Sequence, residues 1–174
     1  MRRSVVRPGH VFSIHRGGQA VQGLNRTSGF TLVELLAVVA IIGALVAIAL
    51  PNYEAYVERS KQTAAMSDMT NIMMAIDRHV IRANEFPATL AEVGFGEALD
   101  PWGNAFQYLR IAGTPRPNRG QLRKDKNLVP LNSDYDLYSM GKDGRSQKPL
   151  TAAASRDDSV RAGNGAFVGL AVDH

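Results

Sequence analysis

The feature that most constrains this chain is an apolar run from Phe30 to Leu50 in which the only polar residues are Thr31 and Glu34. As a helix, these 21 residues would extend roughly 31 Å at about 1.5 Å per residue, enough to cross the hydrocarbon core of a bilayer. A carboxylate in hydrocarbon costs roughly 2.5 kcal/mol or more, so an acidic residue there usually has a partner. The sequence therefore predicts a membrane-spanning helix in which Glu34 has a specific role.

The first 29 residues contain no acidic residue and five arginines: Arg2, Arg3, Arg7, Arg16 and Arg26. The positive-inside rule therefore places this end in the cytoplasm and the long remainder on the other side of the membrane. Without the first 29 residues the chain has 15 basic and 16 acidic residues, a net charge of −1. The net charge of +4 of the whole chain thus comes from this segment, and it gives no indication of a nucleic-acid partner.

The residues after Pro51 continue a helical pattern. Apolar side chains recur there at spacings of three and four, as on the buried face of an amphipathic helix: Tyr53, Tyr56, Val57, Met69, Ile72, Met73, Ile76 and Val80. Proline removes a backbone hydrogen bond and clashes with the preceding turn. We therefore expect one helix from about Phe30 to Arg82, kinked near Pro51, whose second half packs on a globular domain.

Two later stretches alternate polar and apolar residues as strands do, 105–111 and 133–140. A short helical turn is expected around Leu90 to Val93. The Ala, Ser, Asp and Gly content of residues 147–165 predicts a surface loop before a short apolar end at 166–172. The expected fold class is α+β, with a long N-terminal helix, membrane-spanning in its first half and amphipathic in its second, packed on a small antiparallel sheet.

The start of the apolar run resembles the class III signal sequence of type IV prepilins and type II secretion pseudopilins. The matching residues are Gly29, Phe30, Thr31, Leu32 and Glu34, with Pro51 at the end of the run. The resemblance implies that residues 1–29 are a cytoplasmic leader, which a prepilin peptidase removes before methylating the amine of Phe30. It also implies a transmembrane or filament-core helix at 30–51 and a periplasmic pilin-like domain at 52–174.

Two other signal types are the alternatives for this segment. An ordinary signal anchor could contain a glutamate by chance. A cleaved secretory signal would have an apolar region of about 7–15 residues followed by a small-x-small site, which the long run from Phe30 to Leu50 does not match.

The globular half is similar to the major pseudopilin of type II secretion systems over most of residues 30–158. The order that carries this resemblance is Phe86-Pro87, then the segment 100–104 (Asp-Pro-Trp-Gly-Asn) with Tyr108, then the segment 138–144 (Tyr-Ser-Met-Gly-Lys-Asp-Gly). The chain has no cysteine. This also favours a pseudopilin, because many type IV pilins close their C-terminal region with a disulfide.

The resemblance further implies a calcium site formed by the Met140 carbonyl and the side chains of Asp143, Asp157 and Asp158. The chemistry is suitable, because calcium takes six to eight oxygen ligands and can order a loop of low apolar content. Basic residues between the aspartates disfavour a cation unless they point away: Arg145, Lys148 and Arg156. The alternative is that the aspartates are ordinary turn residues.

These implications predict a structural subunit rather than an enzyme. After processing, copies of the chain would leave the inner membrane and polymerise with other pseudopilins, on an inner-membrane assembly platform, into a helical periplasmic filament that pushes folded proteins through the outer membrane. Glu34 would neutralise the N-terminal amine of Phe30 in a neighbouring subunit, because each charge would be costly to bury alone.

Two other functions stay open from the sequence. One is a type IV pilin or minor pilin. The other is a membrane-anchored binding module that never polymerises and uses the loop 113–127, whose basic residues could meet an acidic partner or lipid headgroups: Arg116, Arg119, Arg123, Lys124 and Lys126. The plain interpretation of this loop is a solvated hairpin connection.

Overall fold

A computed structural model of the protein describes residues 29–115 and 120–174. The predicted leader therefore lies outside the described residues except for Gly29. The chain divides into two units between Gly43 and Ala44. Helix α1 runs from Leu32 to Ala83 and includes Pro51. The prediction of one long helix is thus confirmed, while the kink near Pro51 stays a prediction.

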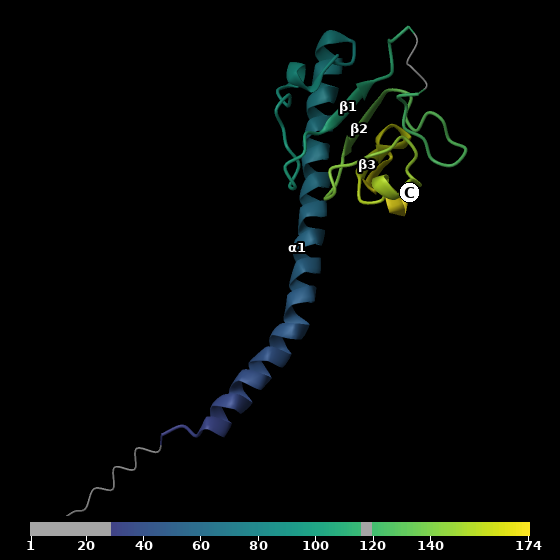
Figure 1. The fold of residues 1–174 in the computed structure, drawn as a ribbon. Helices are drawn as coiled ribbons and strands as arrows, with labels where there is room; N and C mark the ends of the chain where they lie inside the picture. Colours follow the sequence, from purple (N-terminus) through teal and green to yellow (C-terminus); the bar gives the residue numbers. More distant parts are fainter. Residues whose placement is uncertain (1–28, 116–119) are drawn as a thin grey trace, which may run out of the picture. The chain divides into compact units, whose positions relative to one another are not determined.

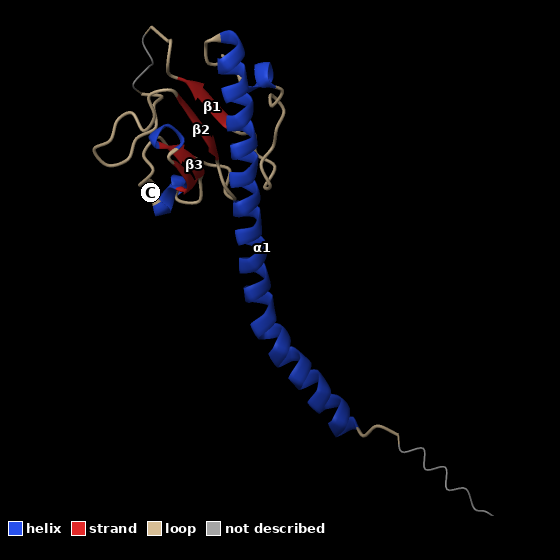
Figure 2. Ribbon diagram, turned by 180° about the vertical axis from the view of Figure 1, so that it is seen from behind, coloured by secondary structure: helices blue, strands red, loops and turns tan. Residues whose placement is uncertain are grey.

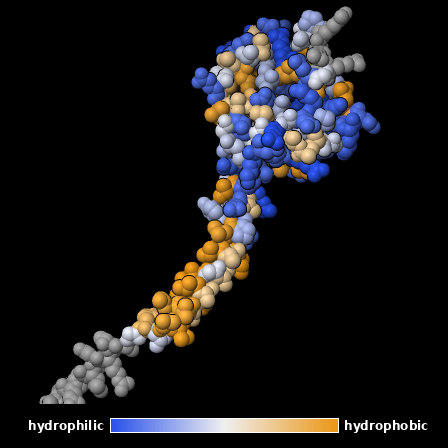
Figure 3. Space-filling model, in the orientation of Figure 1, coloured by the Kyte–Doolittle hydropathy of each residue, from blue (hydrophilic) through white to orange (hydrophobic). Residues whose placement is uncertain are grey.

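The N-terminal part of α1 is apolar on all sides. Every residue from Gly29 to Tyr56 is exposed, and the large aliphatic side chains from Leu32 to Leu50 each expose between 45% and 73% of their surface. An 18-residue window of α1 has a mean hydropathy of 2.8, so its length and composition suffice to cross a membrane. Figure 3 shows these hydrophobic residues gathered on this part of the helix.

The C-terminal part of α1 is amphipathic, as predicted. Its buried residues recur at helical spacing: Ala65, Met69, Ile72, Ala75 and Ile76. The predicted apolar face begins too early, however. Tyr53 and Tyr56 are 66% and 71% exposed, so the buried face starts after them.

A four-stranded antiparallel sheet lies against this part of α1 (Figures 1 and 2). Its strands follow the chain order: β1 (Gln107–Arg110), β2 (Tyr135–Ser139), β3 (Ser159–Ala162) and β4 (Phe167–Leu170). The 3₁₀ helix η1 (Leu90–Val93) confirms the predicted turn, and three more follow later: η2 (Ala153–Ser155), η3 (Gly163–Gly165) and η4 (Ala171–Asp173). The α+β, pilin-like fold class is confirmed.

Strands β1 and β2 lie within the predicted strand regions, but β3 corrects the prediction of a surface loop over 147–165. All four residues of β3 are buried. The strand pairs with β2 on one side and β4 on the other. Its arginine, Arg161, finds hydrogen-bond partners inside the fold, which residue composition does not reveal.

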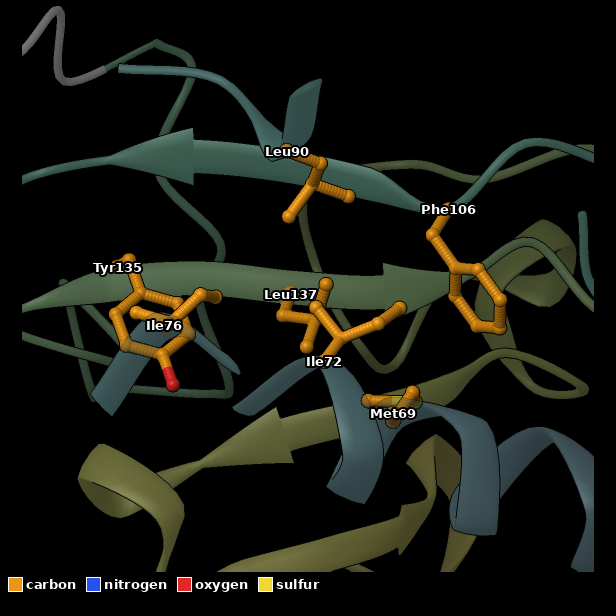
Figure 4. Close-up of a cluster of buried hydrophobic side chains, with 7 residues drawn as sticks. All are labelled: Met69, Ile72, Ile76, Leu90, Phe106, Tyr135 and Leu137. Atoms are coloured by element: carbon orange, nitrogen blue, oxygen red, sulfur yellow. The ribbon is translucent and has the colours of Figure 1, made fainter. Parts of the chain in front are cut away.

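Two apolar clusters lie in the globular domain. In the first, Tyr135 and Leu137 point from β2 toward Met69, Ile72 and Ile76 on α1 (Figure 4); Leu90 and Phe106 complete this cluster. The second contains Leu131, Leu150, Val160, Ala162 and Ala171, with Tyr138 and Phe167 packed against it. Because successive strand residues point to opposite faces, β2 contributes to both clusters.

Candidate functional site

Gly29 and Phe30 lie directly before α1, and Phe30 is 83% exposed. A Cβ atom placed on Gly29 would have no heavy atom of the described residues within 4 Å, and the Gly29 backbone is not in the left-handed region that favours glycine. The fold therefore gives no reason for a glycine at this position. A requirement for a small residue here would have to come from outside the described residues.

Glu34 has a hydrogen-bonding partner in its own chain. Its Oε2 accepts hydrogen bonds from the Thr31 backbone N–H at 2.9 Å and from the Thr31 hydroxyl at 2.8 Å. In return, the Glu34 N–H donates to Thr31 Oγ1 at 3.2 Å. This is a capping box, which satisfies free N–H groups at the start of a helix. The Thr-x-x-Glu spacing is the sequence signal for it, and it had not entered the prediction for Glu34.

The structure brings two of the predicted calcium ligands, Asp143 and Asp157, into contact at the turn after β2. The Asp143 N–H donates to Asp157 Oδ2 at 3.2 Å, and Asp143 Oδ1 accepts from the Arg145 N–H at 2.7 Å. Gly141, which follows Met140, packs directly on Asp157: a Cβ atom on Gly141 would lie 2.7 Å from Asp157 Oδ2. The turn after β2 therefore contacts Asp157 closely.

The fourth predicted ligand, Asp158, faces different groups. It is fully buried, and its Oδ2 lies 2.8 Å from Nη2 of Arg123, which is only 1% exposed. Ser146 completes the group, because its hydroxyl donates to Asp158 Oδ2 at 2.5 Å and accepts from Arg123 Nη1 at 2.6 Å. The guanidinium also stacks on Tyr138, with Cζ 4.1 Å from the ring centroid. Arg123, Asp158, Ser146 and Tyr138 are called the Arg123 cluster below.

Burial raises the pKa of Asp158 to about 6, and the hydrogen bonds from Ser146 and Arg123 oppose this shift. At neutral pH the carboxylate is therefore ionised beside a permanently charged guanidinium. A buried ion pair of this kind depends on both partners, because removal of one leaves the other charge uncompensated.

A second buried arginine has the same construction. Arg161 of β3 is 4% exposed and holds Asp134 through two hydrogen bonds, Nη1 to Oδ1 at 2.8 Å and Nη2 to Oδ2 at 2.6 Å. Its guanidinium lies over the ring of Tyr135, 3.9 Å from the centroid. This bidentate pair explains why a strand that contains an arginine can be buried.

Comparison of the chain with known proteins identifies its family. Residues 24–50 match the model of the prokaryotic N-terminal methylation motif. The chain is 30% identical to type II secretion system core protein G of Pseudomonas aeruginosa over 142 residues, which cover 70% of this chain and 87% of that relative. The chain belongs to the family of type II secretion system core protein G. The resemblance predicted from the sequence is thereby confirmed.

Other relatives support this assignment to the core protein G family. Core protein G of Vibrio cholerae is 29% identical over 142 residues, 70% of this chain and 85% of the relative. A fimbrial protein of Pseudomonas aeruginosa is 38% identical over 81 residues, which cover 43% of this chain and 53% of that relative. No solved structure gives a significant match.

The residues that the resemblance to core protein G suggested as calcium ligands do not form one set here. Among residues 29–115 and 120–174, no three His, Cys, Asp or Glu side chains are grouped so that they could hold a metal ion. Asp158 Oδ1 has no hydrogen-bond partner among the same residues, but one oxygen beside a guanidinium falls far short of six to eight ligands. The chain's residues therefore fit a calcium ion poorly, and calcium binding itself stays a prediction.

The structure also corrects the prediction that the basic residues of the loop 113–127 are all exposed. Arg123 was grouped with the exposed charges of residues 113–127, but it is buried, because Asp158 and Ser146 meet its guanidinium. Lys124 and Lys126 are exposed, whereas Arg116 and Arg119 lie outside the described residues. The Arg123 side chain thus faces inward, and no local sequence signal indicates its partner Asp158, 35 residues away.

Proposed function

We propose that this chain is a structural subunit of a type II secretion pseudopilus, a filament whose growth pushes folded proteins through the outer membrane. One observation carries the proposal: a chain of the core protein G family exposes every side chain of an apolar helix from Leu32 to Leu50. Such a surface needs lipid before assembly and other apolar helices afterwards, because its contact with water is unfavourable. No catalytic activity is part of this proposal.

Processing at Gly29 would prepare the chain for assembly. We place the unassembled protein in the inner membrane as a single-pass protein, with the leader in the cytoplasm and the globular domain in the periplasm. Prepilin peptidase would cut between Gly29 and Phe30 and methylate the new amine. Support comes from the match of residues 24–50 to the methylation motif and from the absence of any packing reason for Gly29 within the described chain.

Glu34 would then set the axial position of each subunit. In the filament core its carboxylate would meet the N-terminal amine of Phe30 from a neighbouring copy, where neither charge could stay unpaired without a large penalty. The capping box is compatible with this role. Thr31 uses Glu34 Oε2 and no hydrogen bond to Oε1 accompanies it among the described residues, so one carboxylate oxygen is available to the amine.

A type IV pilin is the second candidate, favoured by the fimbrial relatives. The match to core protein G covers 70% of the chain, whereas the fimbrial match covers 43%. The longer match includes much more of the chain than one helix, so the pseudopilus is the better-supported assembly. Surface pili that disappear with this gene, in a cell whose type II secretion is unaffected, would favour the pilin.

The experiment combines intact mass with a secretion assay. The chain should be expressed as the sole copy in a strain that lacks its own core protein G. We expect a mature protein that begins at methylated Phe30 and restores secretion. The Glu34→Ala variant should be cleaved normally but should not restore secretion, whereas Asp77→Ala, a change at an exposed position of α1, should behave as wild type. An unprocessed Met1 terminus in cells with active peptidase would indicate the membrane-anchored module instead, and normal secretion by Glu34→Ala would contradict the charge pair.

A further inference from the structure

The segment between β2 and β3, residues 140–158, is long and has little regular structure of its own. Its only helical element among the described residues is the single turn η2, Ala153–Ser155. Ordering such a segment costs conformational entropy, on the order of 1 kcal/mol or more per residue. The segment contributes one residue, Leu150, to the second apolar cluster. Its position must therefore depend strongly on polar contacts.

The Arg123 side chain contacts this segment at two points and strand β2 at a third. Its guanidinium donates to Ser146 within the segment and to Asp158 at its end, and it stacks on Tyr138 of β2. The Arg123 backbone is fixed as well: its N–H donates to buried Asp136 Oδ2 at 3.0 Å, and its carbonyl accepts from the Leu131 N–H at 2.9 Å. The positive charge is thus held rigidly between the sheet and the segment.

The residue after Arg123 extends the same connection. The Lys124 N–H donates to the Lys148 carbonyl at 3.1 Å, and the Lys124 carbonyl accepts from the Leu150 N–H at 2.9 Å. Two backbone hydrogen bonds therefore pair the 123–124 stretch with the middle of the segment. They place the guanidinium of Arg123 beside Ser146 and Asp158, so that side chain and backbone act on the same part of the segment.

We propose that the Arg123 guanidinium is the internal cation that holds residues 140–158 on the sheet, in the role that the family resemblance gives to calcium. A cation is needed there because Asp158 is fully buried. The guanidinium supplies it covalently, with the two hydrogen bonds described above and the Tyr138 ring. A divalent ion bound to Asp158 would face this fixed positive charge at close range, which disfavours binding. The domain should consequently fold and remain stable without calcium.

The test uses the full-length protein in detergent micelles and follows thermal unfolding by the fluorescence of Trp102, the only tryptophan. Wild type should show the same Tm in millimolar calcium and in EGTA. The Arg123→Met variant keeps an aliphatic stem but loses the charge, and it should melt about 10 °C lower or more. Arg145→Met is the matched control, because Arg145 lies in the same segment and is exposed; it should melt within about 2 °C of wild type.

Two further measurements keep the proposal testable if Arg123→Met does not fold. Calorimetric titration of wild type with calcium chloride needs no variant, and we expect no saturable binding. The double variant Arg123→Met, Asp158→Leu removes both charges and should recover much of the lost Tm, since an apolar pair can replace a buried ion pair. Saturable calcium binding that raises the wild-type Tm would overturn the proposal. Equal Tm values for Arg123→Met and Arg145→Met would overturn it as well.

Discussion

Residues 30–50 expose all of their apolar side chains, whereas residues 120–174 bury four charged ones: Arg123, Asp136, Asp158 and Arg161. In the first region no side chain of residues 29–115 or 120–174 covers the apolar surface. In the second region each buried charge has a partner within the chain, through the Arg123 cluster, the Arg161–Asp134 pair and the hydrogen bonds to Asp136.

The apolar side chains of the first region therefore need contacts with other molecules, whereas the buried charges of the second find their partners within the chain. The apolar helix avoids contact with water only in lipid or against other apolar helices. This is the behaviour expected of a subunit that moves from membrane to filament. The globular domain instead satisfies its buried charges internally. Substitutions in the first region should therefore affect processing and assembly, and substitutions in the second should affect the stability of the domain.

The largest expected effect belongs to the first region. Gly29→Leu should abolish processing, because a leucine before Phe30 would not fit a peptidase site that takes glycine, while nothing in the described chain lies close enough to clash with it. Intact mass should show the unprocessed chain, and the unfolding of the globular domain should match wild type. Gly43→Ala is the control, since Gly43 is also exposed and without near neighbours. A mature chain beginning at Phe30 in the Gly29→Leu variant would contradict the processing site.

The next effect tests the second region through its other buried pair. Arg161→Met should lower the free energy of unfolding by about 3 kcal/mol, because it leaves the Asp134 carboxylate without its bidentate partner and removes the cation from the Tyr135 ring. Urea unfolding of the full-length protein measures this. Arg156→Met, a change at an exposed position, should cost less than about 0.5 kcal/mol. An equal loss of unfolding free energy in the two variants would show that the buried pair stabilises the domain no more than an exposed arginine does.

The helix of the first region could be predicted from the sequence, because its information is local, whereas processing at Gly29 and the role of Glu34 in assembly stay predictions. The apolar run, its length and the residues around Gly29 are adjacent in the chain, and helix α1 lies where they predict it. Even the capping box has a local signal, since Thr31 and Glu34 are three residues apart. The amphipathic face of α1 and strands β1 and β2 were predictable for the same reason, from periodicity over a few residues.

The second region could be predicted only in part, because its decisive contacts join distant residues. Arg123 and Asp158 are 35 positions apart, and Arg161 and Asp134 are 27 apart. Composition assigned Arg123 and Arg161 to exposed loops, since arginine is rarely buried without a partner and neither partner is visible locally. Strand β3 was missed for this reason. The pair with Asp134 makes the Arg161 side chain compatible with burial, and no local pattern encodes that contact.

A smaller effect is expected at the turn after β2. Gly141 has φ +64°, and a Cβ atom there would overlap the backbone of Asp157. Gly141→Ala should therefore lower the free energy of unfolding by about 2 kcal/mol, from backbone strain and from steric overlap together. Gly94→Ala isolates the first contribution, because Gly94 has φ +86° but no neighbour within 4 Å of the added Cβ. It should cost only about 1 kcal/mol. A larger loss for Gly94→Ala than for Gly141→Ala would contradict the close packing of Asp157.

The smallest effect concerns an ion pair that is more exposed than the Arg161 pair and has one longer contact instead of two short ones. Lys142 Nζ lies 3.8 Å from Glu58 Oε2, and the Lys142 side chain is 71% exposed. Water and salt screen such a pair, so Lys142→Ala should change the free energy of unfolding by at most about 0.5 kcal/mol. A double-mutant cycle with Glu58→Gln should give a coupling of similar size that disappears in 1 M NaCl, where charges are screened within about 3 Å. The corresponding coupling between Arg161 and Asp134 should be several times larger and should change less with salt, because the Arg161 side chain is 4% exposed and the Asp134 side chain 18%. If the exposed pair coupled as strongly as the buried one, burial could not be the reason that the charges of residues 120–174 stabilise the domain.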